Sequence, residues 1–226
     1  MVRHEIGRAR GGAMPPSLRQ SGPVADVGGP RGSADGFPDI VTANLGRPGL
    51  EGGSVSVRLG AGDGTFGEEH RIGFPSSAEG QAFSVEVADL DRDGRPDLAV
   101  AYLDSRIGFA RGDGRGNFGE TAGDGRRILF PAAHRFVYQA SGMAAVDLDA
   151  DGRVDIAGAG WEGDLAVIWN HGEMFLPDAE MDLRIVAPIW HTPGTRSLKA
   201  LDIDRDGRIE LLVGSEKGLS VFRRAD

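Results

Sequence analysis

The sequence predicts an all-β fold, a β-propeller of four-stranded blades with about four repeats of 55–58 residues. The first observation is an internal repeat. An Asp-Gly pair recurs with its aspartate at Asp35, Asp93, Asp151 and Asp206, at separations of 58, 58 and 55 residues. The second is that short apolar runs bounded by Gly, Asp and Asn accompany these pairs, as they do in β-strands. No window sustains a helical period. Because one isolated blade cannot bury both faces of its sheet, the units are expected to stack around an axis.

The apolar runs follow one another in a fixed order, which assigns them to successive strands. The run before the Asp-Gly pair covers residues 84–88, 142–146 and 197–201, and the run after it covers 98–102, 156–160 and 211–214. A third run covers 54–59, 107–110, 165–169 and 219–222. A Gly-rich turn that ends in Phe follows at Phe66 and Phe118, and a weaker fourth run precedes Pro75, Pro131 and Pro188.

The repeats divide the chain. Residues 1–21 are predicted to be a disordered tail, and residues 22–226 to form units at 22–78, 79–136, 137–193 and 194–226. The tail is basic but lacks the apolar core of a signal peptide, and a start assigned inside a longer gene would explain the missing signal. The fourth unit stops after its third strand, near Arg223. Either the tail supplies the missing outer strand and closes the ring, or the chain is part of a larger propeller whose open edges favour self-association.

Composition excludes several classes of function. The chain has no cysteine, which excludes disulfides, zinc–thiolate sites and a thiol nucleophile. The net charge of −9 argues against a nucleic-acid partner, and no apolar stretch is long enough to span a membrane. The 36 glycines among 226 residues are typical of a protein with many tight turns.

Three Asp-rich loops share one formula, with acids at positions 1, 3, 5 and 9 and Gly at position 6. Such crowding of like charges is costly without a cation. Ca²⁺ accepts six to eight oxygen ligands, whereas Mg²⁺ demands octahedral geometry and keeps its waters, so we expect Ca²⁺. Position 7 is expected to offer its backbone carbonyl. The predicted metal-binding residues are Asp89, Asp91, Asp93, Arg95 and Asp97; Asp147, Asp149, Asp151, Arg153 and Asp155; and Asp202, Asp204, Asp206, Arg208 and Glu210.

Two comparisons limit this prediction. An EF-hand opens with the same Asp pattern but needs Glu at position 12, where this chain has Val100, Gly158 and Val213. The first unit keeps Asp35 and Asp39 but has no acids at positions 1 and 3, unless an insertion brings Asp26 into position 1. Whether that loop binds a metal is left open.

The loops, together with the Phe-Gly pairs at Phe66–Gly67 and Phe118–Gly119, resemble the FG-GAP/VCBS repeats of integrin-α-type β-propellers. The third copy departs from the pattern with Phe175–Leu176, and the Gly-Ala-Pro of that family is reduced to Gly73–Phe74–Pro75 and its counterparts. The resemblance covers about 23–223. It implies a structural Ca²⁺ in the loop between the first two strands of a blade, an extracellular or cell-surface location, and binding to a protein or a glycan. Most members of the family have seven blades, and a few have lyase activity.

No catalytic constellation stands out. The histidines have no zinc spacing, and neither a G-x-S-x-G elbow nor a P-loop is present. The sequence therefore predicts a non-catalytic, Ca²⁺-stabilised repeat module for protein or glycan binding and adhesion. The alternatives are a carbohydrate-active enzyme resembling the polysaccharide lyases, and a gene fragment with no independent function. An enzyme would require acid and base groups to converge near turn residues suited to sugar stacking, namely Tyr102, Asp104, Trp161, Glu162 and Glu216, whereas Trp169 is expected in the core.

Overall fold

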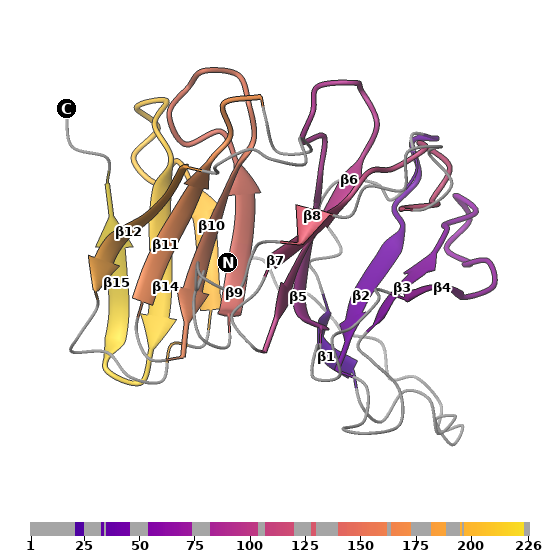
Figure 1. The fold of residues 1–226 in the computed structure, drawn as a ribbon, viewed down its shortest axis with the longest axis horizontal. Helices are drawn as coiled ribbons and strands as arrows, with labels where there is room; N and C mark the ends of the chain where they lie inside the picture. Colours follow the sequence, from indigo (N-terminus) through magenta and orange to yellow (C-terminus); the bar gives the residue numbers. More distant parts are fainter. Residues whose placement is uncertain are drawn as a thin grey trace, which may run out of the picture.

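The computed structural model describes residues 21–24, 33, 35–45, 54–73, 82–103, 107–119, 128–129, 140–161, 164–172, 182–188, 195 and 197–223. These residues form strands, turns and bends without a helix, which confirms the all-β prediction. The strands make four antiparallel sheets that follow one another along the chain (Figure 1). None of the described segments is a helix long and apolar enough to cross a membrane.

Each sheet is a meander of strands that are consecutive in sequence. The first sheet contains β1 (Ser21–Val24), β2 (Ile40–Asn44), β3 (Ser54–Arg58) and β4 (His70–Gly73). The second contains β5 (Ala82–Ala88), β6 (Asp97–Tyr102), β7 (Ile107–Ala110) and β8 (Ile128–Leu129). The third contains β9 (Ala140–Val146), β10 (Asp155–Gly160), β11 (Asp164–Trp169) and β12 (Asp182–Pro188). The last contains β13 (Ser197–Leu201), β14 (Glu210–Ser215) and β15 (Gly218–Phe222).

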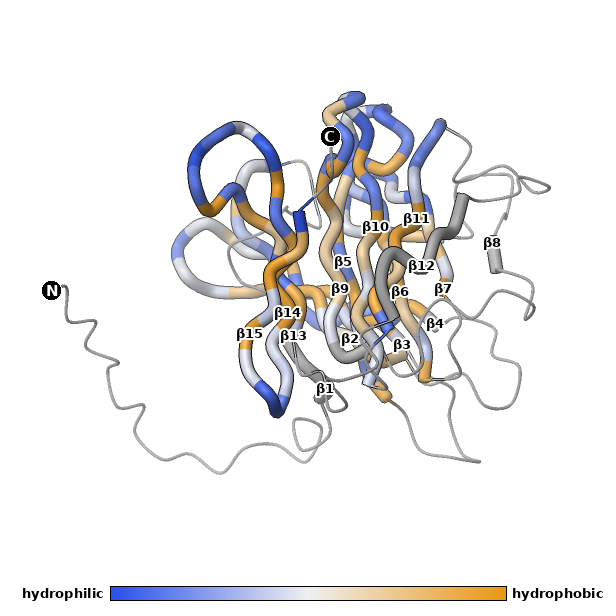
Figure 2. The backbone as a smooth tube through the Cα atoms, turned by 90° about the vertical axis from the view of Figure 1, so that its left-hand side faces the viewer, coloured by the Kyte–Doolittle hydropathy of each residue, from blue (hydrophilic) through white to orange (hydrophobic). Residues whose placement is uncertain are grey.

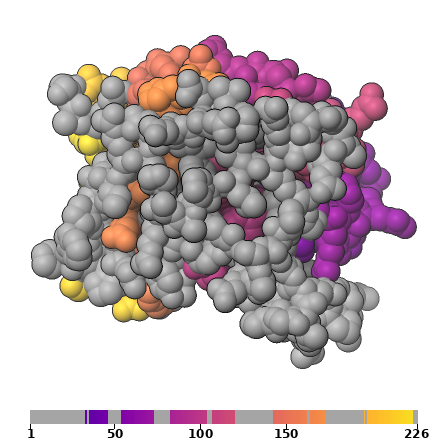
Figure 3. Space-filling model, viewed as in Figure 1, coloured from indigo at the N-terminus to yellow at the C-terminus, as the bar shows by residue number. Residues whose placement is uncertain are grey.

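β1 starts at the last residue of the predicted tail. It begins at Ser21 and pairs with β2 in the first sheet, whereas residues 1–20 of that tail lie outside the described residues. The last sheet has three strands among the described residues. The first and last sheets lie at opposite sides of the molecule in both the ribbon and the space-filling views (Figures 1 and 3).

The core lies between the sheets, because each middle strand is apolar on both faces. On β6, Leu98 and Val100 pack toward the first sheet, whereas Ala99 and Ala101 pack toward the third. This is the two-residue alternation of a strand with both faces covered. Figure 2 shows hydrophobic colours along the strands and hydrophilic loops at their ends. The three inter-sheet cores include Val41, Val55 and Val85; Phe109, Ile156 and Ile168; and Leu165, Leu198 and Leu211.

Small residues set how closely the sheets approach. A Cβ atom built on Gly142 of β9 would lie 2.4 Å from the backbone nitrogen of Leu198 on β13. Such a distance leaves no room for a side chain, so the first strands of the third and last sheets are in backbone contact. Trp169 packs at the edge of the core between these two sheets, as predicted.

Candidate metal centre

The three Asp-rich loops join the first two strands of the second, third and last sheets, and they share one backbone conformation. The glycine at position 6 has a positive φ in each loop: 80° for Gly94, 84° for Gly152 and 88° for Gly207. Position 4 is also left-handed, although it is not glycine there, with φ of 65°, 61° and 63° at Arg92, Ala150 and Arg205. The glycine was predictable from the sequence, whereas this second left-handed position was not.

The first aspartate of each loop caps the turn that these two residues create. Asp89 accepts backbone N–H groups from Asp93 (3.1 Å) and Gly94 (2.9 Å) on its two oxygens. Asp147 does the same with Asp151 (3.2 Å) and Gly152 (2.8 Å). Asp202 repeats the pattern with Asp206 (3.1 Å) and Gly207 (2.9 Å). The loop backbone is thus folded back around one carboxylate.

The turn gathers part of the predicted ligand set. In every loop the acids at positions 1 and 3 belong to a group of three whose nearest oxygens lie within 4.8 Å of one another. The third member is the ninth-position acid in the first two loops and the fifth-position acid in the last. The groups are Asp89, Asp91 and Asp97; Asp147, Asp149 and Asp155; and Asp202, Asp204 and Asp206.

The remaining predicted residues lie beside these groups. Asp93 accepts from the backbone N–H (2.8 Å) and the side-chain Nε (2.9 Å) of Arg95. Asp151 and Asp206 accept from the backbone N–H groups of Arg153 and Arg208, both at 2.8 Å. Glu210 is buried. Its Oε2 accepts the N–H of Ile203 (2.8 Å), and its Oε1 lies 3.5 Å from Nε of Arg223.

The ninth-position acid holds the loop to the end of the third strand. Asp97 accepts N–H groups from Leu90 and Gly112, both at 2.9 Å, and is fully buried. Burial raises the pKa of Asp97 to about 6 against the opposing effect of these two hydrogen bonds, and the charges of Asp91 and Asp93 add to the increase. Asp155 is held in the same way, and burial likewise raises its pKa to about 6.

The first unit retains the ninth-position acid, Asp39, and this residue has the same structural role as Asp97. Asp39 accepts the N–H of Ser33 (2.7 Å) and of Gly60 (2.8 Å), which reproduces the bridge made by Asp97. Asp35 accepts the N–H of Phe37 (2.9 Å) as an ordinary turn residue. No group of three acids forms in the described part of this unit, and Asp26 and Arg31 lie outside the described residues.

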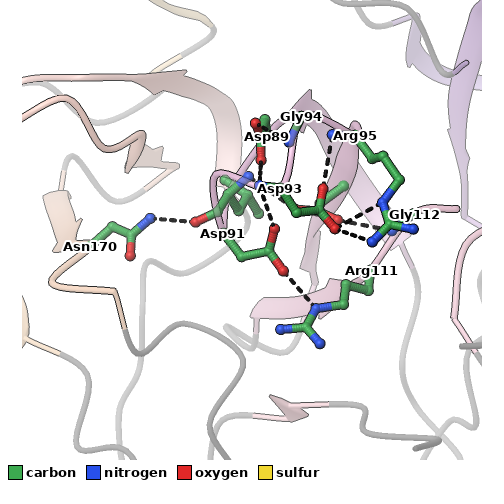
Figure 4. Close-up of polar contacts among 10 residues, drawn as sticks. Asp89, Asp91, Asp93, Gly94, Arg95, Arg111, Gly112 and Asn170 are labelled. Carbon is green, nitrogen blue, oxygen red and sulfur yellow. Dashed lines mark hydrogen bonds and ion pairs between the residues drawn. The ribbon is translucent and has the colours of Figure 1, made fainter. Parts of the chain in front are cut away.

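Two arginines that directly follow the third strands of their sheets contact the loops, and neither was predicted from the sequence. Arg111 Nε lies 2.7 Å from Oδ2 of Asp91 (Figure 4). Arg223 Nη2 lies 2.8 Å from Oδ2 of Asp204. The signal available in the sequence was a basic residue directly after the third apolar run.

Asn170 connects two of the loops. Its side-chain amide donates to the carbonyl oxygens of Leu90 (2.8 Å) and Val154 (3.0 Å), one in each loop. Its backbone N–H donates to Asp155 (2.9 Å). Leu90 and Asn170 are 80 residues apart, so only the stacking of the second and third sheets brings them together.

Of the residues suggested for sugar stacking, Tyr102 is buried, whereas Trp161 and Glu216 are exposed. Tyr102 is 4% exposed and belongs to the core between the first two sheets. Its ring packs over Gly108 of β7. Trp161 is 37% exposed at the end of β10, and Glu216 is exposed in the turn before β15. Asp104 and Glu162 lie outside the described residues.

A family model for the FG-GAP-like repeat matches residues 33–100, 89–157 and 147–213. These overlapping matches cover most of the chain, and the second and third begin at the first aspartate of an Asp-rich loop. The chain belongs to the FG-GAP-like repeat family. Comparison with curated proteins finds no match to the sequence.

The loops of this FG-GAP-like protein have the donor chemistry that a hard divalent cation requires. Their clustered atoms are carboxylate oxygens, the ligands that Ca²⁺ prefers. No sulfur or imidazole donor takes part in the three described groups, which disfavours zinc and copper. Each of the three groups could hold a metal ion.

Proposed function

We propose that this chain is a non-catalytic, calcium-binding repeat module whose sheets are the blades of a β-propeller and which binds a protein or a glycan. The observation that carries the proposal is one loop conformation, with clustered carboxylates, repeated at the same point of three successive sheets. Acidic turns that arise independently have no reason to share two left-handed positions and the same set of hydrogen bonds. The family match supports the repeat character of the module.

The metal would be structural. Bound Ca²⁺ neutralises the repulsion among the clustered carboxylates. In each loop the acids at positions 1 and 3 would hold it, together with Asp97 and Asp155 in the first two loops and Asp206 in the last. The remaining acids and the position-7 carbonyls of Arg95, Arg153 and Arg208 complete the proposed ligand set. At 100 times the dissociation constant, each bound ion adds about 2.7 kcal/mol to the free energy of unfolding.

The partner and the location are part of the same proposal. We infer an extracellular or cell-surface setting, in which structural Ca²⁺ sites stay filled, and an adhesive or recognition role. A second copy of the chain is one candidate partner, because no described strand pairs with the outer edge of β15 and an unpaired edge can pair with a strand of another chain.

A thermal melt tests the metal. The full chain is melted in excess EDTA, then in increasing Ca²⁺, with Mg²⁺ as the comparison ion. We expect a saturable rise in Tm that Ca²⁺ produces at lower concentration than Mg²⁺. The triple variant Asp91→Asn, Asp149→Asn and Asp204→Asn should lose this response.

The matched control is Asp63→Asn, which removes an acid from a similar Gly-Asp-Gly turn outside the three groups. It should keep the full response to Ca²⁺. A wild-type protein that melts cooperatively at the same temperature in EDTA and in Ca²⁺ would disprove the structural metal sites.

A further inference from the structure

The three loops have different residues beside them at one equivalent position near the end of the third strand. The strand register identifies this position. Leu98 pairs with Ala110, Ile156 with Ile168, and Leu211 with Phe222. The next residue along each third strand is therefore equivalent in the three sheets. It is Arg111 in the second sheet, Trp169 in the third and Arg223 in the last.

The side chain at this position contacts the metal-binding group directly in two of the sheets. In the first loop, Asp91 accepts the N–H of Asp93 on Oδ1 (3.2 Å) and pairs through Oδ2 with Arg111 (2.7 Å). In the last loop, Asp204 pairs through Oδ2 with Arg223 (2.8 Å). Each guanidinium thus occupies one oxygen of a clustered carboxylate.

The middle loop lacks this cation. Asp149 accepts the N–H of Asp151 on Oδ1 (3.2 Å), and within the described part of the chain no guanidinium contacts its Oδ2. Trp169 carries no charge and packs toward the last sheet. Among the described residues no guanidinium therefore pairs with the third-position carboxylate of the middle loop, although the guanidinium of Arg92 from the first loop lies beside Gly152.

One other position also differs in charge: position 4 is Arg92 in the first loop and Arg205 in the last but Ala150 in the middle loop, although the guanidinium of Arg92 lies beside Gly152 of the middle loop. Position 7 is arginine in all three loops, and Arg95 and Arg153 each lie beside the fifth-position acid of their own loop, with Nε–Oδ2 separations of 2.9 Å and 3.9 Å. The acids at positions 1, 3 and 5 are aspartates throughout. The last loop differs further in having Glu210 at position 9, but Glu210 also faces Arg223.

We propose that Arg111 and Arg223 are built-in counter-ions of the first and last loops, so that the middle loop fills with Ca²⁺ before the other two. This inference rests on the proposed metal function of the loops. A divalent cation entering the first or last loop must displace a guanidinium from its carboxylate or bind close to its charge. Both are unfavourable, and for a partly exposed site they correspond to about a tenfold weaker affinity.

Two readouts on the full chain test the order of filling. Isothermal titration calorimetry with Ca²⁺ should give one tight site and two sites about tenfold weaker. Titration with Tb³⁺, read as the tryptophan-sensitised emission that Trp169→Phe removes, reports on the middle loop, because Trp169 directly precedes Asn170, which donates to Asp155. This emission should saturate near one equivalent of Tb³⁺.

Charge-removal variants identify the cause. Arg111→Gln together with Arg223→Gln should tighten the two weak sites about tenfold, so that the three sites merge into one class. The control is Arg58→Gln paired with Arg71→Gln, which removes the same charge from the first sheet, where Arg58 and Arg71 contact Glu69. The control should leave two classes of site. Melts in EDTA check that each variant is folded.

The outcomes separate the two ideas. Three equal sites in the wild-type protein, sensitised emission that rises only after two equivalents, or weak sites unaffected by the double variant would each overturn the counter-ion proposal while leaving calcium binding intact. Absence of Ca²⁺ and Tb³⁺ binding by the folded wild-type protein would overturn the proposed metal function itself, and this inference with it.

Discussion

The side-chain amide of Asn170 donates a hydrogen bond to the carbonyl oxygen of Leu90 across the interface of the second and third sheets, at 2.8 Å. Leu90 is the second residue of one Asp-rich loop, and Asn170 is hydrogen-bonded to Val154 and Asp155 of the next. Asn170 is 2% exposed. Adjacent loops are therefore joined by a buried polar contact.

Removing this amide should destabilise the protein. Asn170→Ala leaves the buried carbonyl oxygen of Leu90 and the partly buried one of Val154 without their donor, and the expected loss in the free energy of unfolding is about 2 kcal/mol. Urea denaturation measures it. Asn117→Ala, which removes a local contact with Asp113 in a half-buried turn, serves as control and should cost less. Equal losses for the two variants would contradict a special role for Asn170.

The bridging acid of the first unit should act without metal. Asp39→Ala removes the acceptor of two backbone N–H groups and should lower the free energy of unfolding by about 2 kcal/mol, to the same extent in EDTA and in Ca²⁺. Asp91→Ala should behave differently, because its main cost appears only in Ca²⁺. Chemical denaturation under both conditions distinguishes them. A larger cost of Asp39→Ala in Ca²⁺ than in EDTA would indicate a metal in the first unit.

Stability without metal should fall as the pH rises from about 4 to about 7. The pKa values of Asp97 and Asp155 are raised by burial to about 6 in the folded protein, above the ordinary 3.8. The folded state therefore holds protons that the unfolded state releases, so unfolding becomes easier as these groups ionise. Asp63, Glu69, Asp93 and Asp113 have lowered pKa values and contribute the opposite slope, but only below their ordinary values of 3.8 to 4.5.

Melts in EDTA at pH 5, 6 and 7 measure this dependence. Tm should be highest at pH 5, and Asp155→Asn should flatten the curve. In saturating Ca²⁺ the direction should reverse, since protons compete with the metal for carboxylates. An EDTA series in which Tm rises from pH 5 to pH 7 would show that these two acids are not the dominant titrating groups.

The left-handed residue at position 4 offers a route to a more stable loop. Ala150 adopts a φ of 61°, a conformation that costs a residue with a Cβ atom about 1 kcal/mol. Ala150→Gly removes this cost, and after the greater entropy of glycine in the unfolded chain is subtracted, a gain of up to ~0.5 kcal/mol is expected. The control, Ala61→Gly in an exposed turn without positive φ, should destabilise. Thermal melts of both variants, compared in EDTA, check the sign.

The strands and the Asp-rich loops were predictable because their signals are local. The alternation along residues such as Leu98, Ala99 and Val100 and the Asp-Gly turns are written into neighbouring positions, and their repetition marked four units before any contact was known. The predicted runs 98–102, 156–160 and 211–214 lie within β6, β10 and β14. Local patterns did not reveal the left-handed residue at position 4, since Arg92, Ala150 and Arg205 share no side-chain property that favours it.

Only the tertiary structure decided how the loops are supported and how they differ. Asp97 is held by a nitrogen seven residues before it and another fifteen residues after it, and the second of these depends on the pairing of β6 with β7. Arg111, Trp169 and Arg223 become equivalent only through strand register, and Asn170 meets Leu90 only because the sheets stack. These contacts join segments far apart along the chain, so their partners are set by packing geometry, which no single stretch of sequence contains.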